Sequence, residues 1–270
     1  MSQTSGDVPL LSLRDVTKSF GAVQALRGVD LDVYPGQVTA LVGDNGAGKS
    51  TLIKTISGIH PIDSGEISWN GEPVSITGPT SSTHLGIQTV YQDLALCDNL
   101  DIVQNMFLGR ETTSRGLLNE ADMEKAAGRT LSDLSVTTVQ SIRQLVGSLS
   151  GGQRQAVAVA RAVMWEAKLV ILDEPTAALG VSQTAMVLEL IKRLSSQGIA
   201  VLFISHNLND VFAVSDRLAV LRLGRMAEQG ILSDYDTQTV VQLITTGSAA
   251  HPTPNGAATA TATATSAGKG

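Results

Sequence analysis

The chain has 270 residues, of which 43% are hydrophobic, 16% are charged and 3% are aromatic. This balance excludes a disordered chain, which would be polar and rich in charge, and the length suits one large domain or a domain with a subdomain. The formal net charge of -6 lacks the basic balance of a dedicated nucleic-acid binder, so we expect no nucleic-acid partner.

Two further features limit the class of protein. Cys97 is the single cysteine, so neither a disulfide framework nor a cysteine-based metal site can form within one chain. The first residues lack a basic segment followed by an apolar one, and no apolar run approaches 18 residues. We therefore expect neither a signal peptide nor a membrane-spanning segment, and contact with a membrane only through a partner.

The N-terminal part begins with short strands that are separated by turns. A Pro-Gly turn at Pro35–Gly36 divides one apolar stretch, and Asn70-Gly71 is typical of a tight hairpin turn. Gly58 follows a helical pattern and is a candidate C-cap. The expected elements are strands at 11–20 and on both sides of the turn within 26–42, a helix at 50–59, a hairpin at 66–76 and a strand at 86–93.

From about residue 95 to 165 the pattern is helical, because apolar residues recur every three or four positions. Strands and helices then alternate, which predicts a parallel sheet with crossover helices and an inserted helical subdomain. Residues 248–270 form an Ala/Thr/Gly/Pro segment that we expect to be disordered. The later elements are a strand at 169–175, a helix at 182–198, a strand at 199–207, a short helix at 208–216 and a hairpin at 217–230.

The stretch LVGDNGAGKST at residues 41–51 fits the pattern G-x-x-x-x-G-K-[ST]. Glycines let the backbone bend around a ligand, and the N-terminus of the following helix favours an anion. Lys49 adds a charge for the outer phosphates, and Ser50 offers a hydroxyl to Mg²⁺. A glycine-rich turn that merely joins a strand to a helix is the alternative. The strand before the loop and the helix after it favour a nucleoside triphosphate site.

The strand LVILDEP at residues 169–175 ends in two acids. Strand ends in such sheets face the ligand crevice, where Asp173 is expected to hold Mg²⁺ and Glu174 to orient an attacking water. Two acids before a proline turn are common and carry no function by themselves. Their combination with the glycine loop favours the catalytic interpretation.

The sequence LSGGQ at residues 149–153 lies between the glycine loop and the acid strand. With these three motifs in this order, residues 10–245 resemble the nucleotide-binding subunit of an ATP-binding-cassette (ABC) transporter. The resemblance implies an α/β fold, a P-loop NTPase cassette with a RecA-like parallel-sheet core, an N-terminal antiparallel β subdomain and an inserted helical subdomain. We expect the cassette to span residues 10–247, with the helical subdomain at about 95–165.

The resemblance also implies roles for residues outside the motifs. Phe20 looks like the aromatic that stacks on adenine, with Ala25 nearby, and a phenylalanine of the core is the less favoured alternative. Gln92 looks like the glutamine that reaches Mg²⁺ and water, and His206 like the switch histidine at the γ-phosphate. An ordinary surface glutamine and a structural histidine are the alternatives. The implied ATP-binding set is Phe20, Ala25, Gly43, Asp44, Asn45, Gly46, Ala47, Gly48, Lys49, Ser50 and Thr51, with Glu174, His206 and Gln92 catalytic and Ser50, Gln92 and Asp173 on Mg²⁺.

In the family, two subunits pack head to tail, so that LSGGQ of one completes the ATP site of the other. The resemblance therefore implies a homodimer or a paired cassette subunit. The family often has Ser-Ala-Leu-Asp after DEPT, whereas this chain ends the same segment with Gly180. The substitution puts communication between the two sites in doubt. The residues that would act on the partner's ATP are Leu149, Ser150, Gly151, Gly152 and Gln153.

The stretches VYQDLALCDNLDIVQNMFLGRE and ISHNLNDVFAVSDRLAVLRLGR look like importers of monosaccharides of the ribose, xylose and fructose kind. The chain carries a single cassette. The resemblance implies a separate integral-membrane permease, an extracytoplasmic sugar-binding protein and a peripheral location at the cytoplasmic face of the membrane. Import of a non-sugar solute, a soluble ABC ATPase acting on ribosomes or DNA, and an ATP-sensing regulator remain alternatives.

Overall fold

A computed structural model describes residues 8–114, 116–136 and 139–248. Its centre is a six-stranded sheet with strand order β12-β11-β3-β10-β9-β6. The neighbours from β11 to β6 are parallel, and β12 pairs antiparallel with β11. The carboxyl ends of the parallel strands therefore meet at one edge. The strands are β3 (Val38–Val42), β6 (Ile87–Val90), β9 (Leu169–Asp173), β10 (Ala200–Ile204), β11 (Arg217–Arg222) and β12 (Arg225–Ile231).

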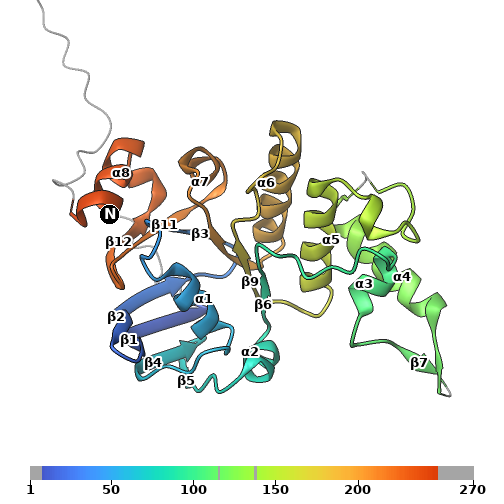
Figure 1. The fold of residues 1–270 in the computed structure, drawn as a ribbon, viewed down its shortest axis with the longest axis horizontal. Helices are drawn as coiled ribbons and strands as arrows, with labels where there is room; N and C mark the ends of the chain where they lie inside the picture. Colours follow the sequence, from blue (N-terminus) through green and yellow to red (C-terminus); the bar gives the residue numbers. More distant parts are fainter. Residues whose placement is uncertain (1–7, 115, 137–138, 249–270) are drawn as a thin grey trace, which may run out of the picture.

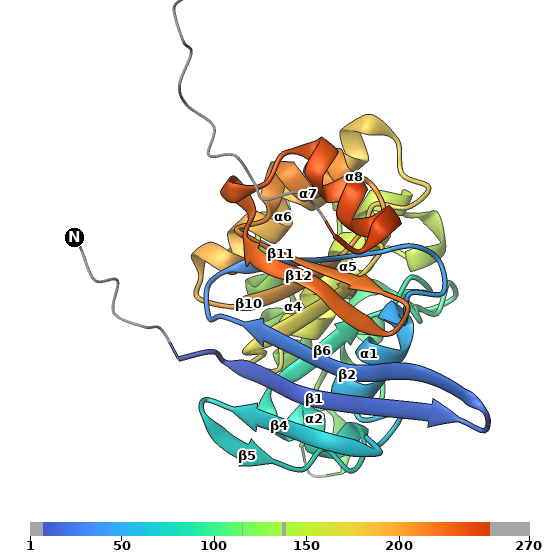
Figure 2. The ribbon, with the colours of Figure 1, turned by 90° about the vertical axis from the view of Figure 1, so that its left-hand side faces the viewer.

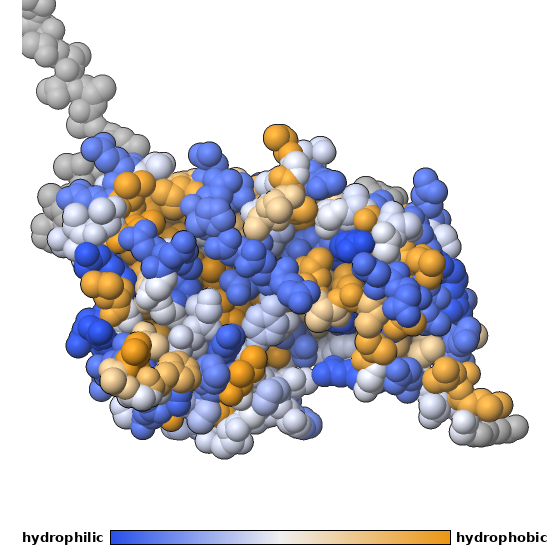
Figure 3. Space-filling view, in the orientation of Figure 1, coloured by the Kyte–Doolittle hydropathy of each residue, from blue (hydrophilic) through white to orange (hydrophobic). Residues whose placement is uncertain are grey.

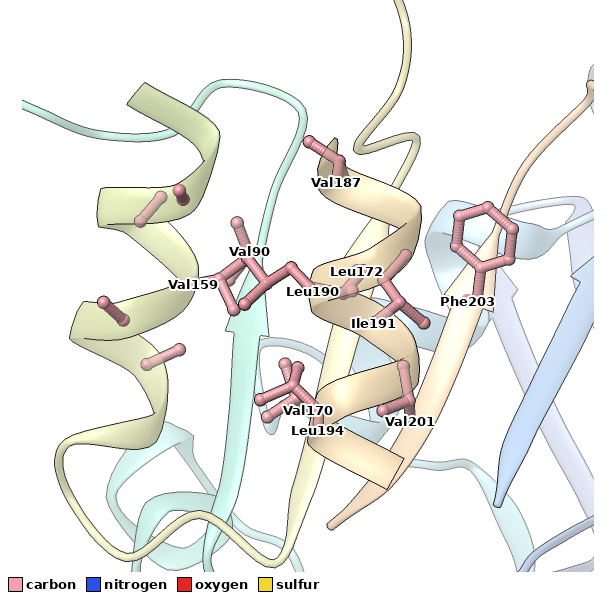
Figure 4. Packing of buried hydrophobic residues seen from close by; sticks show 14 of the residues in the cluster. Val90, Val159, Val170, Leu172, Val187, Leu190, Ile191, Leu194, Val201 and Phe203 are labelled. Carbon is pink, nitrogen blue, oxygen red and sulfur yellow. The ribbon is translucent and has the colours of Figure 1, made fainter. Parts of the chain in front are cut away.

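The central strands are buried on both faces, as expected for parallel strands under crossover connections. In β9, Val170 and Leu172 pack toward the helices, whereas Leu169 and Ile171 pack toward the opposite face, and all four are 0% exposed. Phe203 in β10 belongs to the core on the helical side, and Figure 4 shows it at the edge of the displayed cluster, on the side of Leu172 and Ile191. Because side chains alternate along a strand, one short apolar run contributes to two cores.

A second, antiparallel sheet has the order β2-β1-β4-β5 and lies below β11 and β12 in Figure 2. Its core is shared with helix α1, whose buried Leu52, Ile53 and Ile56 contact the sheet side chains. The predicted hairpin turn is present, with Asn70 at φ 52° and Gly71 at φ 81°. The elements are β1 (Leu11–Phe20), β2 (Val23–Val33), β4 (Ser64–Trp69), β5 (Glu72–Val74) and α1 (Lys49–Ile56).

The segment from about 95 to 165 lies at the far end of the molecule from the antiparallel sheet (Figure 1). It is mainly helical, as expected, but it also carries a two-stranded hairpin that the sequence did not reveal, because two-residue strands have no measurable periodicity. Leu117 and Leu118 of this hairpin are 75% and 56% exposed, and apolar atoms are visible there in Figure 3. The elements are α3 (Ile102–Phe107), β7 (Thr113–Ser114), β8 (Leu117–Leu118), α4 (Glu120–Asp133), a 3-10 turn (Val146–Ser148) and α5 (Gly151–Val163).

The remaining helices cover the central sheet or its connections. Two of them, α2 and α8, were not expected from the sequence, and in α2 the sequence PTSSTHL has too few apolar side chains to show a helical period. None of the helices within the described ranges is long and apolar enough to cross a membrane. The expected disordered tail lies, apart from Ser248, outside the described residues. These elements are α2 (Pro79–Leu85), α6 (Val181–Ser196), α7 (Leu208–Val214), a 3-10 turn (Leu232–Asp234) and α8 (Thr237–Thr246).

Candidate functional site

The glycine loop joins β3 to α1 at the carboxyl edge of the central sheet. Gly43 has φ 155°, and a Cβ there would overlap the carbonyl oxygen of Leu221. Gly48 has φ 108° at the N-cap of α1, and its Cβ would lie 2.9 Å from the carbonyl oxygen of Ala25. Larger residues at both positions would push the loop away from its neighbours. Glycine therefore lets the loop fold tightly over the helix N-terminus, where an anion is favoured.

Lys49 at the start of α1 closes the loop on itself. Its Nζ donates to the carbonyl oxygens of Gly43 at 2.6 Å and Asp44 at 3.1 Å. Burial lowers the pKa of Lys49, and the negative charges of Glu174, Asp173 and Asp44 oppose that shift. The ammonium group thus lies between the loop and the acid pair.

The acid pair begins where β9 ends. Asp173 is the last residue of the strand, and Glu174 follows at φ 49°, with its N–H donating to the carbonyl oxygen of Ile204 at 3.0 Å. Such a backbone angle is uncommon outside glycine and indicates strain held by the surrounding fold. Burial, followed by the charge of Glu174, raises the pKa of Asp173, whereas Lys49 and Lys54 act in the opposite direction. Two carboxylates are therefore held together at the edge of the sheet.

His206 lies just beyond the end of the neighbouring strand β10. Its Nδ1 is 2.7 Å from Oε2 of Glu174. The histidine side chain is 70% exposed and the glutamate side chain 21%. A carboxylate can only accept, so in this pair Nδ1 donates and Nε2 remains for another partner.

These elements surround an open pocket of about 460 Å³. Most of the ATP-binding residues predicted from the sequence line it, together with Gln92, Asp173 and Glu174. Four of the residues predicted to bind ATP or act on it within the same chain do not line it, namely Phe20, Gly43, Ala47 and His206. The lining residues are Val23, Gln24, Ala25, Arg27, Asp44, Asn45, Gly46, Gly48, Lys49, Ser50, Thr51, Gln92, Asp173, Glu174, Leu223 and Gly224.

The residues outside the lining have different surroundings. Ala47 is 3% exposed, and His206 reaches the pocket through Glu174. Phe20 ends β1, and its ring packs edge-on against His60 at 5.0 Å, with Lys18 Nζ 5.7 Å from its centroid. The ring is 44% exposed, so its stacking on adenine stays a prediction.

Sequence reasoning missed one wall of the pocket. Leu223 and Gly224 form the tight turn between β11 and β12, which the sequence predicted as a hairpin without a role in binding. Gly224 N–H donates to Ala47 at 2.8 Å, and Arg27 N–H donates to Gly224 at 2.7 Å. This wall is therefore fixed to the glycine loop. Three further lining residues that were not predicted, Val23, Gln24 and Arg27, lie close in the sequence to the predicted Ala25. Their closeness to Ala25 was the one sequence feature that could have indicated them.

The LSGGQ segment begins α5. Ser150 Oγ accepts from the N–H of Gln153 at 3.3 Å, and Gln153 Oε1 accepts from the N–H of Ser150 at 2.9 Å, which is a capping box. A Cβ on Gly151 would lie 2.9 Å from a methyl group of Leu179. None of residues 149–153 lines the pocket, and α5 lies beyond α6 from α1 in Figure 1. A single chain therefore does not bring LSGGQ and the glycine loop together.

The sequence profile of the ABC transporter family matches residues 26–177, which is more than half of the chain. The chain belongs to the ABC transporter family. It is the ATP-binding and ATP-hydrolysing cassette of such a system, and the observed α/β architecture with its antiparallel β subdomain is that of an ABC cassette.

Three curated relatives have similar sequences. A fructose import ATP-binding protein from Rhizobium meliloti is 50% identical over 80% of this cassette and 86% of its own length. A xylose/arabinose import ATP-binding protein from Sulfolobus acidocaldarius is 46% identical, over 87% of this cassette and 94% of its own length. A ribose import ATP-binding protein from Yersinia pestis is 40% identical, and the cassette spans 46% of it.

Solved structures agree in fold. An ATP-binding cassette of an ABC transporter in its ADP conformation has a TM-score of 0.75 and 27% identity, covering 87% of this cassette and 94% of that chain. A dimeric cassette in a post-hydrolysis state, bound to ADP and phosphate, has a TM-score of 0.68 and 25% identity, covering 82% and 98%.

The segment after the acid pair contains the departure at Gly180. Thr176 Oγ1 donates to Asp210 Oδ2 of α7 at 2.7 Å, which fixes the start of the segment. Gly180 is the N-cap of α6 and supplies no side-chain acceptor to the helix. An aspartate at this position would cap α6 and add a negative charge. With Gly180, the cassette has neither the side-chain cap nor the charge there.

Proposed function

We propose that the cassette is the ATP-hydrolysing subunit of an importer for a monosaccharide, acting through a separate permease at the cytoplasmic face of the membrane. The observation that carries this proposal is the 50% and 46% identity with two sugar import ATP-binding proteins, over nearly their whole length. The ribose relative is about twice as long as the matched region and supports the same substrate class.

The pocket supports ATP as the substrate. The N-terminus of α1 and the ammonium group of Lys49 together favour the outer phosphates. Lys49 Nζ donates hydrogen bonds to two loop carbonyl groups, which hold it beside the position that the phosphates would take. We assign adenine to the side of the pocket near Ala25 and Phe20, where β1 and β2 meet.

The residues around the acid pair fit a magnesium ion. Asp173, Ser50 and Gln92 offer carboxylate, hydroxyl and amide oxygens, which are the hard ligands that Mg²⁺ prefers. The raised pKa of Asp173 marks a half-buried pair of carboxylates whose repulsion a cation would relieve. When bound, Mg²⁺ neutralises charge on the phosphates.

Glu174 and His206 are suited to the chemical step. Glu174 uses Oε2 for the bond to His206 and has Oε1 for a water molecule, whose proton it would accept. The bond from Nδ1 fixes the imidazole ring, so Nε2 is directed to a second partner, which we propose to be the γ-phosphate. The side chain of Gln92 would help to orient the same water.

A second cassette would complete the site. Ser150 and Gly151 are exposed at the N-terminus of α5 outside the pocket, and Gly152 next to them is buried. A partner's phosphates could approach this helix end from the side of Ser150 and Gly151. The dimeric cassette bound to ADP and phosphate supports pairing of two cassettes, and we propose that they pack head to tail. Closure on ATP would drive the permease, and hydrolysis with phosphate release would reset it. A homodimer and a pair of related cassettes are both compatible with this arrangement.

Affinity purification from gently solubilised host membranes, with partners identified by mass spectrometry, tests the proposal. We expect an integral-membrane permease and, less firmly attached, an extracytoplasmic sugar-binding protein. The purified complex is then placed in vesicles and supplied with ATP and labelled fructose, xylose, arabinose or ribose. Uptake of one of these sugars that requires ATP, and that stops in the Glu174→Gln complex, would establish the function.

Other outcomes identify the alternatives. Recovery of only ribosomal, DNA-bound or soluble partners would remove transport as the purpose and leave the ATPase chemistry intact. A permease that moves none of the four sugars would point to a different solute. ATP binding without hydrolysis in the complete complex would favour an ATP-sensing regulator.

A further inference from the structure

Gln92 lies in a segment without regular structure, between the end of β6 at Val90 and the start of α3 at Ile102. Its side chain lines the pocket and makes no hydrogen bond to any of the described residues. On its N-terminal side, Tyr91 Oη lies 3.0 Å from Ser57 Oγ at the end of α1. The support on the other side must come from elsewhere in the fold.

Arg161 in α5 provides that second support. Its Nη1 donates to the carbonyl oxygen of Ala95 at 2.8 Å, and its Nη2 donates to that of Leu94 at 3.1 Å. The planar guanidinium thus holds two consecutive carbonyl groups, a geometry that a lysine cannot reproduce. Figure 1 shows the chain passing α5 on its way from β6 to α3.

The surroundings of Arg161 favour a specific role over a general ionic contact. None of the ion pairs among the described residues involves Arg161, and burial lowers its pKa. Burying a cation is unfavourable unless strong hydrogen bonds compensate, and here backbone carbonyls supply them. The same segment contains Ala95 at φ 49°, a strained angle that persists only when neighbours hold it.

The remainder of the segment is fixed separately. Asn105 is 0% exposed. It accepts from the N–H of Cys97 at 2.7 Å and donates to the carbonyl oxygens of Cys97 and Leu100 at 3.0 and 3.2 Å. Arg161 therefore holds the half of the segment nearer the pocket, and Asn105 holds the half nearer α3.

We propose that Arg161 is a positioning residue, which fixes the backbone at Leu94 and Ala95 and thereby holds Gln92 at the nucleotide pocket. Two peptide units separate Gln92 from Leu94, whose carbonyl group Arg161 fixes. Because consecutive Cα atoms are about 3.8 Å apart, Gln92 lies within a short distance of that fixed point. Tyr91 and Leu94 then restrain Gln92 from both sides. The inference rests on the proposed function to the extent that Gln92 acts in ATP hydrolysis.

Hydrogen exchange of the full chain tests the positioning directly. In Arg161→Met, the backbone amides of residues 92–96 should exchange at least about tenfold faster, while those of β6, α3 and Cys97, which Asn105 holds, keep their protection. Arg110→Met is the matched control. Arg110 and Arg161 both line a cavity of about 170 Å³ beside α5. The guanidinium of Arg110, however, lies over the Trp165 ring, 5.2 Å from its centroid. The Arg110→Met variant should leave the amide exchange of residues 92–96 unchanged.

Steady-state ATPase kinetics test whether Arg161 acts through Gln92. Arg161→Met should lower kcat about tenfold, which equals about 1.4 kcal/mol, and change KM less than about threefold. Arg161→Lys can reach one carbonyl at a time and should be intermediate. When Gln92 is already replaced by alanine, Arg161→Met should lower kcat by a further factor of less than about two. The reason is that Arg161 is proposed to act on kcat through the position of Gln92, so its effect is lost with that side chain.

Two results would overturn the proposal. One is unchanged amide exchange of residues 92–96 in Arg161→Met, or in Arg161→Lys if the methionine variant does not fold. The other is an equal loss of kcat on Arg161→Met in the wild-type chain and in the Gln92→Ala chain. That result would show that Arg161 does not act through Gln92. If the wild-type chain hydrolysed no ATP, the proposed function would fail, and the exchange measurement would still decide whether Arg161 holds the segment.

Discussion

Glu174 Oε2 and His206 Nδ1 lie 2.7 Å apart although 32 positions separate the two residues in the sequence. Each follows the end of a strand, and the two strands, β9 and β10, are parallel neighbours with Asp173 opposite Ile204. The sheet register therefore creates the pair.

Replacing Glu174 with glutamine should separate binding from catalysis. The amide keeps the size of the side chain and can still bond to His206, but it cannot accept a proton from water. We expect kcat to fall by about 10² to 10⁴ and the dissociation constant for ATP to change less than about twofold. Phosphate release and equilibrium binding measure the two quantities. Glu189→Gln, at an exposed position on α6, is the control, and normal turnover by Glu174→Gln would remove its catalytic assignment.

The charge of Asp173 should destabilise the nucleotide-free protein. Because burial and Glu174 raise the pKa of Asp173, the folded state resists ionisation. The destabilisation is absent below the unfolded-state pKa of about 3.9 and complete above the folded-state pKa. Asp173→Asn should therefore raise the melting temperature at pH 7.5, with the gain shrinking toward pH 4. Thermal unfolding at both values checks this, with the exposed Asp133→Asn as control, and a gain that is independent of pH would contradict it.

Loss of the Lys49 ammonium group should weaken nucleotide binding. In Lys49→Ala the phosphates lose a cation, and the loop loses its bonds to the carbonyl groups of Gly43 and Asp44. We expect at least about a tenfold loss of ATP affinity, since hydrogen bonds to charged groups contribute about 1.5 to 3 kcal/mol each. Titration calorimetry measures it. Lys54→Ala removes a lysine from the same helix outside the pocket, and equal effects of both would argue against a specific role for Lys49.

Mixing two inactive variants tests the shared site. Lys49→Ala damages the glycine loop, whereas Ser150→Glu places a negative charge where the partner's phosphates are expected. A mixed head-to-tail pair keeps one site in which both halves are intact. ATPase activity should therefore reappear on mixing and rise with the fraction of mixed pairs. If the mixture stays as inactive as its components, although pairing is shown by light scattering, the two-chain site would be wrong.

The helical side of the sheet should depend on Phe203. This side chain is 0% exposed and packs in the larger of the two cores. Phe203→Ala should lower the free energy of unfolding by about 3 to 5 kcal/mol, from lost burial and from the cavity left behind. Urea denaturation measures the loss. Val181→Ala, at a side chain 91% exposed, should stay within about 0.5 kcal/mol.

Much of the fold followed from local pattern. The apolar runs at 169–172 and 200–204 are short and continuous, which is the mark of strands buried on both faces. Asn70-Gly71 specified its own turn, because both residues adopt the positive φ that such a turn needs. The helix α2 and the β7–β8 hairpin were not predicted from the sequence. They contain too few apolar residues at regular spacing to show a helical or a strand period.

The sequence by itself determined the chemistry of the glycine loop and the acid pair, since each depends on neighbouring residues whose spacing is fixed by covalent geometry. Tertiary structure decided which distant groups join them. The turn at Leu223 and Gly224 forms a wall of the pocket only because β11 pairs with β3. Arg161 reaches Leu94 only because α5 packs beside that segment. Contacts of this kind depend on how whole elements pack, and no local pattern of residues encodes them.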